Sequence, residues 1–305
     1  MTRQELNEDK QKEIFKEENR QKRKKIIIKV VKIIIIFLIA FYSFFLYQTY
    51  IATSNVIVKE KRIINKNIPN SFNGTKIIHF SDLHYGSNID YKKLKSIVKL
   101  INSRNPDLVF FTGDLIDKNH SLNNKEQEEL IDELKGINAS LGKYAVSGDE
   151  DLDNFTTIMN QSGFIVLNNE YDLLYNKTND AILLSGFASS INKNIDINKG
   201  MQYYSQDTAN SNIFSIVITH EPDNTDNILN VHDVDLILSG HSHNGNIRFP
   251  YLGTIFTTNG AKKYKNDYYK INNSSLYISS GLGTRKNEIR LFCHPSIYFF
   301  RISNS

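Results

Sequence analysis

The sequence predicts an α/β domain preceded by one transmembrane helix, and three observations support this class. Short runs rich in Ile, Val, Leu and Phe alternate with amphipathic helical patterns from about residue 75 onward. Several of these runs are followed within three residues by Asp or His. A stretch of 20 residues without a charge, Ile33 to Ala52, comes before them. With 305 residues, 40% of them hydrophobic, the chain can form a sizeable core.

The N-terminal segment changes character near residue 25. Residues 1–25 alternate acidic and basic side chains, so we expect a charged, solvated tail. Residues 26–52 are predicted to cross a lipid bilayer, because about 20 apolar residues span a hydrocarbon core of roughly 30 Å. A buried core helix and a cleaved signal peptide are the alternatives. The apolar stretch is longer than that of a typical signal peptide, and no clear small-x-small cleavage site follows it.

The basic residues on the two sides of this helix predict its orientation. Seven lie on the N-terminal side: Arg20, Lys22, Arg23, Lys24, Lys25, Lys29 and Lys32. Four lie on the C-terminal side: Lys59, Lys61, Arg62 and Lys66. The positive-inside rule then predicts a single-pass protein of the cell membrane, with its N-terminus in the cytoplasm and the large domain outside.

The net charge of +4 comes from the N-terminus. Residues 1–32 hold 11 Lys/Arg and 6 Asp/Glu, which leaves 26 and 27 for the rest of the chain, a net charge of −1. A near-neutral body lacks the basic surface that binds a phosphate backbone, so no nucleic acid is expected as a partner. The single cysteine, Cys293, excludes an intramolecular disulfide framework, and we expect it to be a packed thiol.

The elements of the domain follow a polar linker over residues 53–74 and extend over residues 75–303. The predicted buried strands are Lys76–Phe80, Leu108–Phe111, Tyr144–Val146, Ile182–Leu184, Phe214–Ile218 and Leu236–Leu238. Helices are predicted over Tyr91–Ser103 and Lys125–Leu134. The later runs have no strongly helical segments between them and predict antiparallel strands: Gly245–Phe249, Leu276–Ser279, Ile289–Phe292 and Ile297–Ile302.

Five predicted strands end in side chains that can bind a metal ion. The segments that follow them are Ser81-Asp82-Leu83-His84, Thr112-Gly113-Asp114, Ser147-Gly148-Asp149-Glu150, Thr219-His220 and Ser239-Gly240-His241-Ser242-His243. Ligands bind beyond the carboxyl ends of strands in open α/β sheets, because side chains of neighbouring strands converge there. A single Asp or His after a strand is commonly a turn former. Five in succession predict one shared site.

These segments carry a resemblance to a known family. Asp-x-His, Gly-Asp, an altered Gly-Asn-His box, a lone His and Gly-His-x-His resemble the calcineurin-like metallophosphoesterases, from about Lys76 to Arg301. The segments around these motifs resemble those of a bacterial, membrane-anchored phosphodiesterase branch that includes UDP-diacylglucosamine pyrophosphatase-like members. They read SDLHYG, GDLID, THEPD, GHSHNGNIRFP and SSGLGT. The resemblance implies a four-layer αββα metallophosphoesterase sandwich and a binuclear metal site.

The resemblance also implies ligands and a reaction. It assigns Asp82, His84 and His243 to one ion, Asp149, His220 and His241 to the other, and Asp114 to both. Mn, Fe and Zn ions accept such mixed imidazole and carboxylate sets, and two of them activate a shared water for attack on phosphorus. We therefore expect a phosphoesterase with two divalent metal ions. It would hydrolyse a phosphodiester or pyrophosphate bond in a phosphorylated small molecule or lipid, by attack of a metal-bridging hydroxide.

Residues 148–151 depart from the family pattern. Gly148-Asp149-Glu150-Asp151 stands where the family usually has Gly-Asn-His-Asp. The family's histidine can protonate the leaving oxygen, a contribution of roughly 10²- to 10⁴-fold. Three outcomes are open: Glu150 is protonated by its anionic surroundings and acts as the acid, the enzyme is slower and needs a good leaving group, or the protein binds metal without turnover. The last is the alternative function, a catalytically silent surface protein.

The remaining candidates match no metal box. His79 lies inside the first strand, where a core or surface role is expected, and His120, His232 and His294 are expected in loops. The stretch Lys262–Lys270 contains four Lys and three Tyr. It either rests on anionic lipid headgroups or forms a solvated loop.

Overall fold

The computed structural model describes residues 3–52, 54–151, 154–192, 195–206, 212–249, 251–254, 257–284 and 289–305. The chain divides into two compact units, Met1–Ile51 and Ala52–Ser305.

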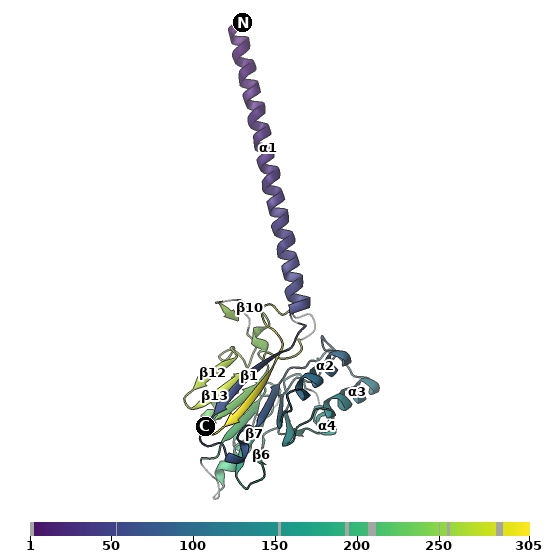
Figure 1. Cartoon of the computed structure of the whole chain (residues 1–305), viewed down its shortest axis with the longest axis vertical. Coiled ribbons are helices and arrows are strands. Elements are labelled where there is room, and N and C mark those ends of the chain that lie inside the picture. Colours follow the sequence, from purple (N-terminus) through teal and green to yellow (C-terminus); the bar gives the residue numbers. More distant parts are fainter. Residues whose placement is uncertain are drawn as a thin grey trace. The chain divides into compact units, whose positions relative to one another are not determined.

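The first unit is one long helix (Figure 1). Helix α1 (Arg3–Leu46) passes through residue 25 without a break and continues into η1 (Tyr47–Ala52), which has π-helical hydrogen bonding. Large apolar side chains such as Ile36 and Phe37 are exposed along it. Among the described residues, Lys10–Ile51 is the helix that is long and apolar enough to cross a membrane, judged by length and composition.

The second unit is built on two six-stranded sheets of mixed direction. The first sheet has the order β1-β14-β2-β3-β4-β5 and the second the order β12-β13-β9-β8-β7-β6. In the first sheet the strands are β1 (Ile57–Ile64), β14 (Ser296–Ser303), β2 (Lys76–Phe80), β3 (Leu108–Thr112), β4 (Gly142–Val146) and β5 (Ile165–Val166). In the second they are β12 (Tyr268–Ile271), β13 (Ser274–Ile278), β9 (Leu236–Ser239), β8 (Ser215–Thr219), β7 (Ala181–Phe187) and β6 (Glu170–Tyr175). A separate two-stranded ribbon consists of β10 (Arg248–Phe249) and β11 (Gly253–Thr254).

The two sheets pack face to face and helices cover their outer faces, which confirms the sandwich expected from the resemblance. Ile77 and Phe110 of the first sheet lie in one buried cluster with Ile216 and Leu238 of the second. The outer face of the first sheet carries α2 (Tyr91–Asn102), α3 (Asn124–Lys135) and α4 (Phe155–Gln161). The outer face of the second carries the short helices α5 (Ile197–Gly200) and α6 (Asn224–Leu229). Short 3₁₀ segments are η2 (Asn70–Phe72), η3 (Gln202–Ser205) and η4 (His243–Gly245).

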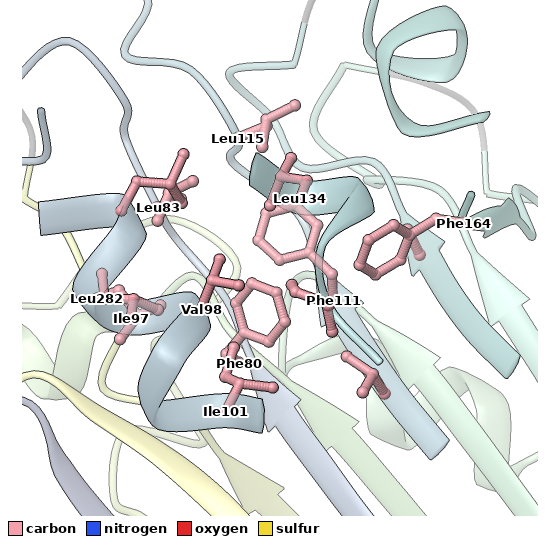
Figure 2. Close-up of a cluster of buried hydrophobic side chains, with 14 of the residues drawn as sticks. Phe80, Leu83, Ile97, Val98, Ile101, Phe111, Leu115, Leu134, Phe164 and Leu282 are labelled. Carbon is pink, nitrogen blue, oxygen red and sulfur yellow. The ribbon is translucent and has the colours of Figure 1, made fainter. Parts of the chain in front are cut away.

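The side-chain periods of the sequence account for these layers. Successive residues of a strand point to opposite faces, so Phe110 faces the second sheet while Phe111 faces the helices. Figure 2 shows Phe80 and Phe111 packed beside Val98 of α2 and Leu134 of α3. The N-terminus of α2 is capped by the Asp90 carboxylate, which accepts a 2.7 Å bond from the Lys93 N–H. Asn123 and Glu126 form a capping box at the start of α3.

Three expectations for the elements are corrected. The segment expected as part of a polar linker contains β1, which pairs in parallel with β14 over its whole length. Ile289–Phe292 is not a strand: among the described residues it makes one isolated bridge, from Leu291 to Ile247. The expected strand Gly245–Phe249 shrinks to β10, because the chain first turns through η4.

The direction of the central strands determines where a site can form. In the first sheet β2, β3 and β4 run parallel, and in the second sheet β7, β8, β9 and β13 do. Parallel neighbours present their carboxyl ends at the same edge of a sheet. The loops that follow β2, β3, β4, β8 and β9 therefore carry the predicted ligands.

Candidate metal centre

One group of candidate ligands consists of two carboxylates and two imidazoles. Ligand atoms of Asp114, Asp149, His220 and His241 all lie within 4.8 Å of one another. Asp149 Oδ1 is 3.0 Å from His220 Nε2 and 2.9 Å from His241 Nδ1. These side chains come from loops after β3 and β4 of one sheet and after β8 and β9 of the other, so the group bridges the sandwich.

A second group lies at the same edge of the sandwich. Ligand atoms of Asp82, His84 and His243 also lie within 4.8 Å of one another. His243 Nε2 is 3.4 Å from Asp82 Oδ1 and 3.1 Å from His84 Nε2. Asp82 and His84 follow β2, whereas His243 follows β9 of the other sheet.

Asp114 connects the two groups. Its Oδ2 atom lies 3.4 Å from His220 Nε2 and 3.7 Å from His84 Nε2, and its Oδ1 atom accepts a 2.9 Å bond from the Glu150 N–H. Oδ2 is buried and accepts no hydrogen bond from the described part of the chain. A buried carboxylate oxygen without a donor is costly unless a cation satisfies it. The donor set therefore fits two divalent ions that share Asp114.

Backbone strain is concentrated at these ligands. Five of the seven have φ angles in the left-handed region, between 44° and 63°: Asp82, His84, Asp114, His241 and His243. Residues other than glycine adopt this region rarely, and such strain persists where the surrounding structure holds it for a functional purpose. The strand ends thus turn sharply enough to direct consecutive side chains into one pocket.

Backbone carbonyls select which nitrogen of two imidazoles faces the site. His220 Nδ1 lies 2.6 Å from the Thr112 carbonyl oxygen, and His241 Nε2 lies 2.6 Å from that of Asn259. A carbonyl only accepts, so these nitrogens carry the protons and donate. In the neutral imidazoles, His220 Nε2 and His241 Nδ1 would therefore offer their lone pairs to a metal ion; when protonated instead, these two atoms donate to Asp149.

The electrostatics of the first group also suit a cation. Burial acts to lower the pKa of His220, but the nearby carboxylates of Asp114 and Asp149 outweigh it and raise this pKa well above its ordinary value. Burial acts to raise the pKa of Asp149, but hydrogen bonds from His220 and His241 outweigh it and lower this pKa. Excess negative charge that draws protons to imidazoles can equally be neutralised by a divalent ion.

Glu150 lies at the edge of the site and faces His84. Its Oε2 atom is 3.3 Å from His84 Nδ1, and its Oε1 atom is 3.5 Å from Lys118 Nζ. Ligand atoms of His84, Asp117 and Glu150 form a third group within 4.8 Å of one another. The sequence placed Glu150 at the site but did not indicate these contacts. Its expected role as an acid stays a prediction.

Two supporting residues were missed by the sequence analysis. The buried Asp151 carboxylate accepts backbone N–H bonds from Asp114, Leu115 and Gly148, at 2.7–2.9 Å. The Arg290 guanidinium is buried and donates to the carbonyls of Ser280, Gly281 and Gly283. Asp151 had a signal, since it completes the Gly-x-x-Asp pattern after β4. No sequence signal pointed to Arg290, because it lies in Ile289–Phe292, which was expected to form a strand.

The remaining histidines and the single cysteine lie outside the two ligand groups that Asp114 connects. His79 is fully buried, with Nε2 2.9 Å from Thr112 Oγ1, and belongs to the core. His120, His232 and His294 belong to no metal-ligand group among the described residues. Cys293 is a buried free thiol whose Sγ lies 3.2 Å from the carbonyl oxygen of His243.

Comparison with known proteins gives the same picture over most of the chain. The family model "calcineurin-like phosphoesterase" matches residues 75–245. The metallophosphoesterase YkuE of Bacillus subtilis (strain 168) is 30% identical over 268 residues, which cover 85% of this chain and 90% of YkuE.

Two further relatives are longer than the matched region. The metallophosphoesterase Cj0846 of Campylobacter jejuni is 27% identical, over 83% of this chain and 66% of its own length. The "transmembrane protein with metallophosphoesterase domain" of Danio rerio is 26% identical, over 71% of this chain and 50% of its own length. The chain therefore spans about half of the zebrafish protein that it matches.

Proposed function

Since the chain belongs to the calcineurin-like phosphoesterase family, we propose that it is a membrane-anchored hydrolase of phosphodiester or pyrophosphate bonds that works with two divalent metal ions. The observation that carries the proposal is the pair of ligand groups joined at the buried Asp114 Oδ2. The substrate would be a phosphorylated small molecule or a lipid, including nucleotide-linked lipids.

The ligand groups divide the binding of the ions between them. Asp82, His84 and His243 would hold one ion and Asp149, His220 and His241 the other, with Asp114 between them. When bound, two such ions polarise the phosphoryl group and lower the pKa of a water between them, which supplies the nucleophile near neutral pH.

The protein's own residues position these groups. The carbonyls of Thr112 and Asn259 hold two imidazoles in the required tautomer. Asp151 ties the loop after β3 to the loop after β4, so that Asp114 and Asp149 stay in register. Preorganised ligands do not have to be reoriented when substrate binds, which favours catalysis.

Glu150 and Lys118 together flank the expected position of the substrate. A bare carboxylate would repel a phosphate, and the Lys118 ammonium 3.5 Å away partly offsets its charge. A protonated Glu150 could donate to the leaving oxygen, as expected from the sequence. The contact with His84 Nδ1 supports a different use of Glu150, in which it orients that imidazole.

The membrane anchor is part of the proposal. The long apolar helix Lys10–Ile51 supports it, as does the zebrafish relative named as a transmembrane protein. The excess of basic residues on the N-terminal side favours an extracytoplasmic domain. Protease added to intact cells should then remove the domain. Full protection until the cells are lysed would contradict this orientation.

A second candidate function is a metal-binding surface protein with weak or no turnover. The observation that favours it is Glu150 in place of an imidazole that can donate a proton, with its carboxylate already engaged by His84 and Lys118. In that case the ions bind normally and hydrolysis stays at the background level.

Hydrolysis of bis-p-nitrophenyl phosphate by the full-length chain with Mn²⁺ distinguishes the hydrolase from the metal-binding protein without turnover. The enzyme reading predicts activity that EDTA abolishes and that falls by about 10²-fold or more in Asp114→Asn. Asp180→Asn is the matched control, because Asp180 is exposed in the turn between β6 and β7. Wild-type protein that binds Mn²⁺ but hydrolyses no faster than Asp114→Asn would favour the silent protein.

A further inference from the structure

The ribbon β10–β11 projects apolar side chains into solvent. Tyr251 is fully exposed and Leu252 is 79% exposed, at the turn that joins the two short strands. Phe249 and Phe292, both partly exposed, lie beside this turn with ring centroids 6.4 Å apart. Large apolar side chains that are grouped and exposed mark a surface that binds an apolar partner. We call Phe249, Tyr251, Leu252 and Phe292 the apolar tip (β10 in Figure 1).

The base of the ribbon is held firmly to the domain. The Arg248 guanidinium donates to Asn266 Oδ1 at 2.9 Å. The backbone N–H of Arg248 donates to the Leu291 carbonyl, also at 2.9 Å. Thr254 Oγ1 donates to the carbonyl of Asn244 at 2.7 Å. Because these bonds fix both strands, the exposure of the tip is a built feature of the fold.

The ribbon is also close to where the domain is tethered. Ile57, the first residue of β1, lines one surface pocket together with Arg248 and Phe292. Five residues lie between Ile51 and Ile57, and the six residue-to-residue steps of this segment extend at most about 20 Å. If the apolar helix crosses a bilayer, this edge of the domain cannot leave the membrane surface by more than about that distance.

We propose that the apolar tip inserts into the headgroup and acyl-chain boundary of the lipid leaflet next to the domain. Tyr251 has an apolar ring and a polar hydroxyl, the combination that favours this boundary. Two adjacent side chains projecting from a turn fit into a fluid leaflet without a matching protein groove. The cations of Arg248 and Lys265, which line the pocket beside the tip, complement anionic headgroups.

Docking of this kind has a consequence for the substrate. Asn244, which accepts the Thr254 bond, directly follows the candidate ligand His243. The inserted tip therefore holds the loop that carries His243 close to the leaflet. This part of the inference rests on the proposed hydrolase function, and it favours phosphoesters carried by membrane lipids.

Within the stretch Lys262–Lys270, the structure does not favour Lys262 and Lys263 for the same task. Lys263 Nζ pairs with the Asp226 carboxylate at 2.7 Å, and the backbone N–H groups of Lys262 and Lys263 donate to Asp223. These bonds belong to a solvated loop that is folded against α6. The apolar tip is therefore the better candidate for membrane contact.

Tryptophan fluorescence tests the proposal, because the chain has no Trp. The full-length Tyr251→Trp variant is reconstituted into phosphatidylcholine and phosphatidylglycerol vesicles with and without brominated acyl chains. Tyr175→Trp is the matched control: Tyr175 is 53% exposed on β6, which is the edge strand farthest from β12 in the order of the second sheet. Brominated lipid should reduce the emission of Tyr251→Trp by about half or more, since interfacial side chains lie within about 5–10 Å of the headgroup boundary. The control should be unaffected.

Flotation, hydrolysis and quenching of fluorescence together distinguish failure of the tip to insert from failure of the anchor or of the catalytic site. Flotation of the variants with the vesicles reports the anchor, and hydrolysis of bis-p-nitrophenyl phosphate reports the catalytic site. Co-flotation and normal hydrolysis, with Tyr251→Trp no more quenched than Tyr175→Trp, would overturn the insertion of the tip alone. Failure of both variants to float would contradict the anchor and, with it, the docking of the tip.

Discussion

A single side chain, Asp151, sets the positions of two loops at the candidate centre. Its Oδ2 atom accepts from the Asp114 and Gly148 N–H groups and its Oδ1 atom from that of Leu115. Gly148 itself allows no larger residue, because a Cβ there would lie 2.2 Å from Asp114 Oδ1. The geometry of the Asp114 carboxylate therefore depends on Asp151, which belongs to none of the ligand groups.

Replacing Asp151 by Asn should loosen this arrangement. An amide offers one accepting oxygen, and its NH₂ group would face an N–H donor, so we expect a loss of about 1–3 kcal/mol in the free energy of unfolding. Urea unfolding of the detergent-solubilised chain measures it, with Asp180→Asn as the control. Mn²⁺ affinity should fall as well. Stability and affinity equal to the wild type would contradict this role of Asp151.

His79 makes stability depend on pH from inside the core. Burial lowers its pKa from 6.5 to about 3. Between these two pH values the His79 side chain binds a proton in the unfolded chain but stays neutral in the folded chain. Its contribution to stability is complete above pH 6.5 and is lost by about 1.4 kcal/mol per pH unit as the pH falls toward 3.

The His79→Gln variant should lack this loss. Urea unfolding between pH 7.5 and 5 measures the difference in unfolding free energy between the variant and the wild type, which should shift in favour of the variant as the pH falls. His294→Gln, at an exposed position, should leave the wild-type slope unchanged. Parallel slopes for His79→Gln and the wild type would show that His79 is not held neutral in the core.

At the residue scale the sequence identified which side chains gather but not how they point. Asp82, His84, Asp114, Asp149, His220, His241 and His243 could be predicted, because each follows a buried strand. The direction of Glu150 toward His84 Nδ1 could not, since it depends on the loop backbone around Asp114.

The elements show which patterns are local and which are not. The helix α2 could be predicted from Leu94, Ile97, Val98 and Ile101, whose spacing lies within one segment. Strand β1 could not, because its sequence IVKEKRII is mostly exposed and it pairs with β14, more than 230 residues away. Its charged side chains are typical of an edge strand that avoids further pairing.

Lys143 joins two helices to the first sheet. From β4 its ammonium donates to the carbonyls of Leu134 and Lys135, at the end of α3, and to that of Ser162, after α4. It also lies 4.9 Å from the centre of the Phe164 ring. A cation at two helix C-termini satisfies carbonyls that have no partner in the helix.

The Lys143→Met variant keeps the apolar stem and removes the donor. Its free energy of unfolding should fall by about 1–3 kcal/mol, because the carbonyls of Lys135 and Ser162 lose the ammonium donor while that of Leu134 keeps the Ile137 N–H. Lys125→Met, at an exposed i,i+4 pair with Glu129, should change it by less than about 0.5 kcal/mol. Equal effects of the two substitutions in urea unfolding would contradict the role given to Lys143.

At the scale of the whole molecule, the two sheets each supply part of one centre. Asp82, His84, Asp114 and Asp149 follow strands of the first sheet, and the three remaining histidines follow strands of the second. Ions bound there would connect the sheets at their carboxyl edge. Folding and metal binding should therefore be linked.

Removal of metal should lower the thermal stability of the chain. A ligand that binds only the folded state at 100 times its Kd contributes about 2.7 kcal/mol. We expect the midpoint of thermal unfolding to fall on treatment with EDTA and to recover with Mn²⁺. Asp114→Asn should show a smaller difference between the two conditions. A midpoint insensitive to EDTA in the wild type would show that the sheets are not linked by bound ions.

The convergence of the strand ends could be predicted at this scale, and the outer surface could not. Alternating strands and helices determine that parallel strands end at one edge, which places the ligands together. The exposure of Tyr251 and Leu252 depends on how the β10–β11 ribbon leaves the sheets, and no periodicity in Gly245–Phe249 indicates it.

The metal content of the full-length chain tests the central claim most directly. After loading with Mn²⁺ and removal of free ions, inductively coupled plasma mass spectrometry should find about two ions per wild-type chain and one or fewer in Asp114→Asn. A wild-type chain without stoichiometric metal, or two ions retained in Asp114→Asn, would contradict a centre shared by the two ligand groups.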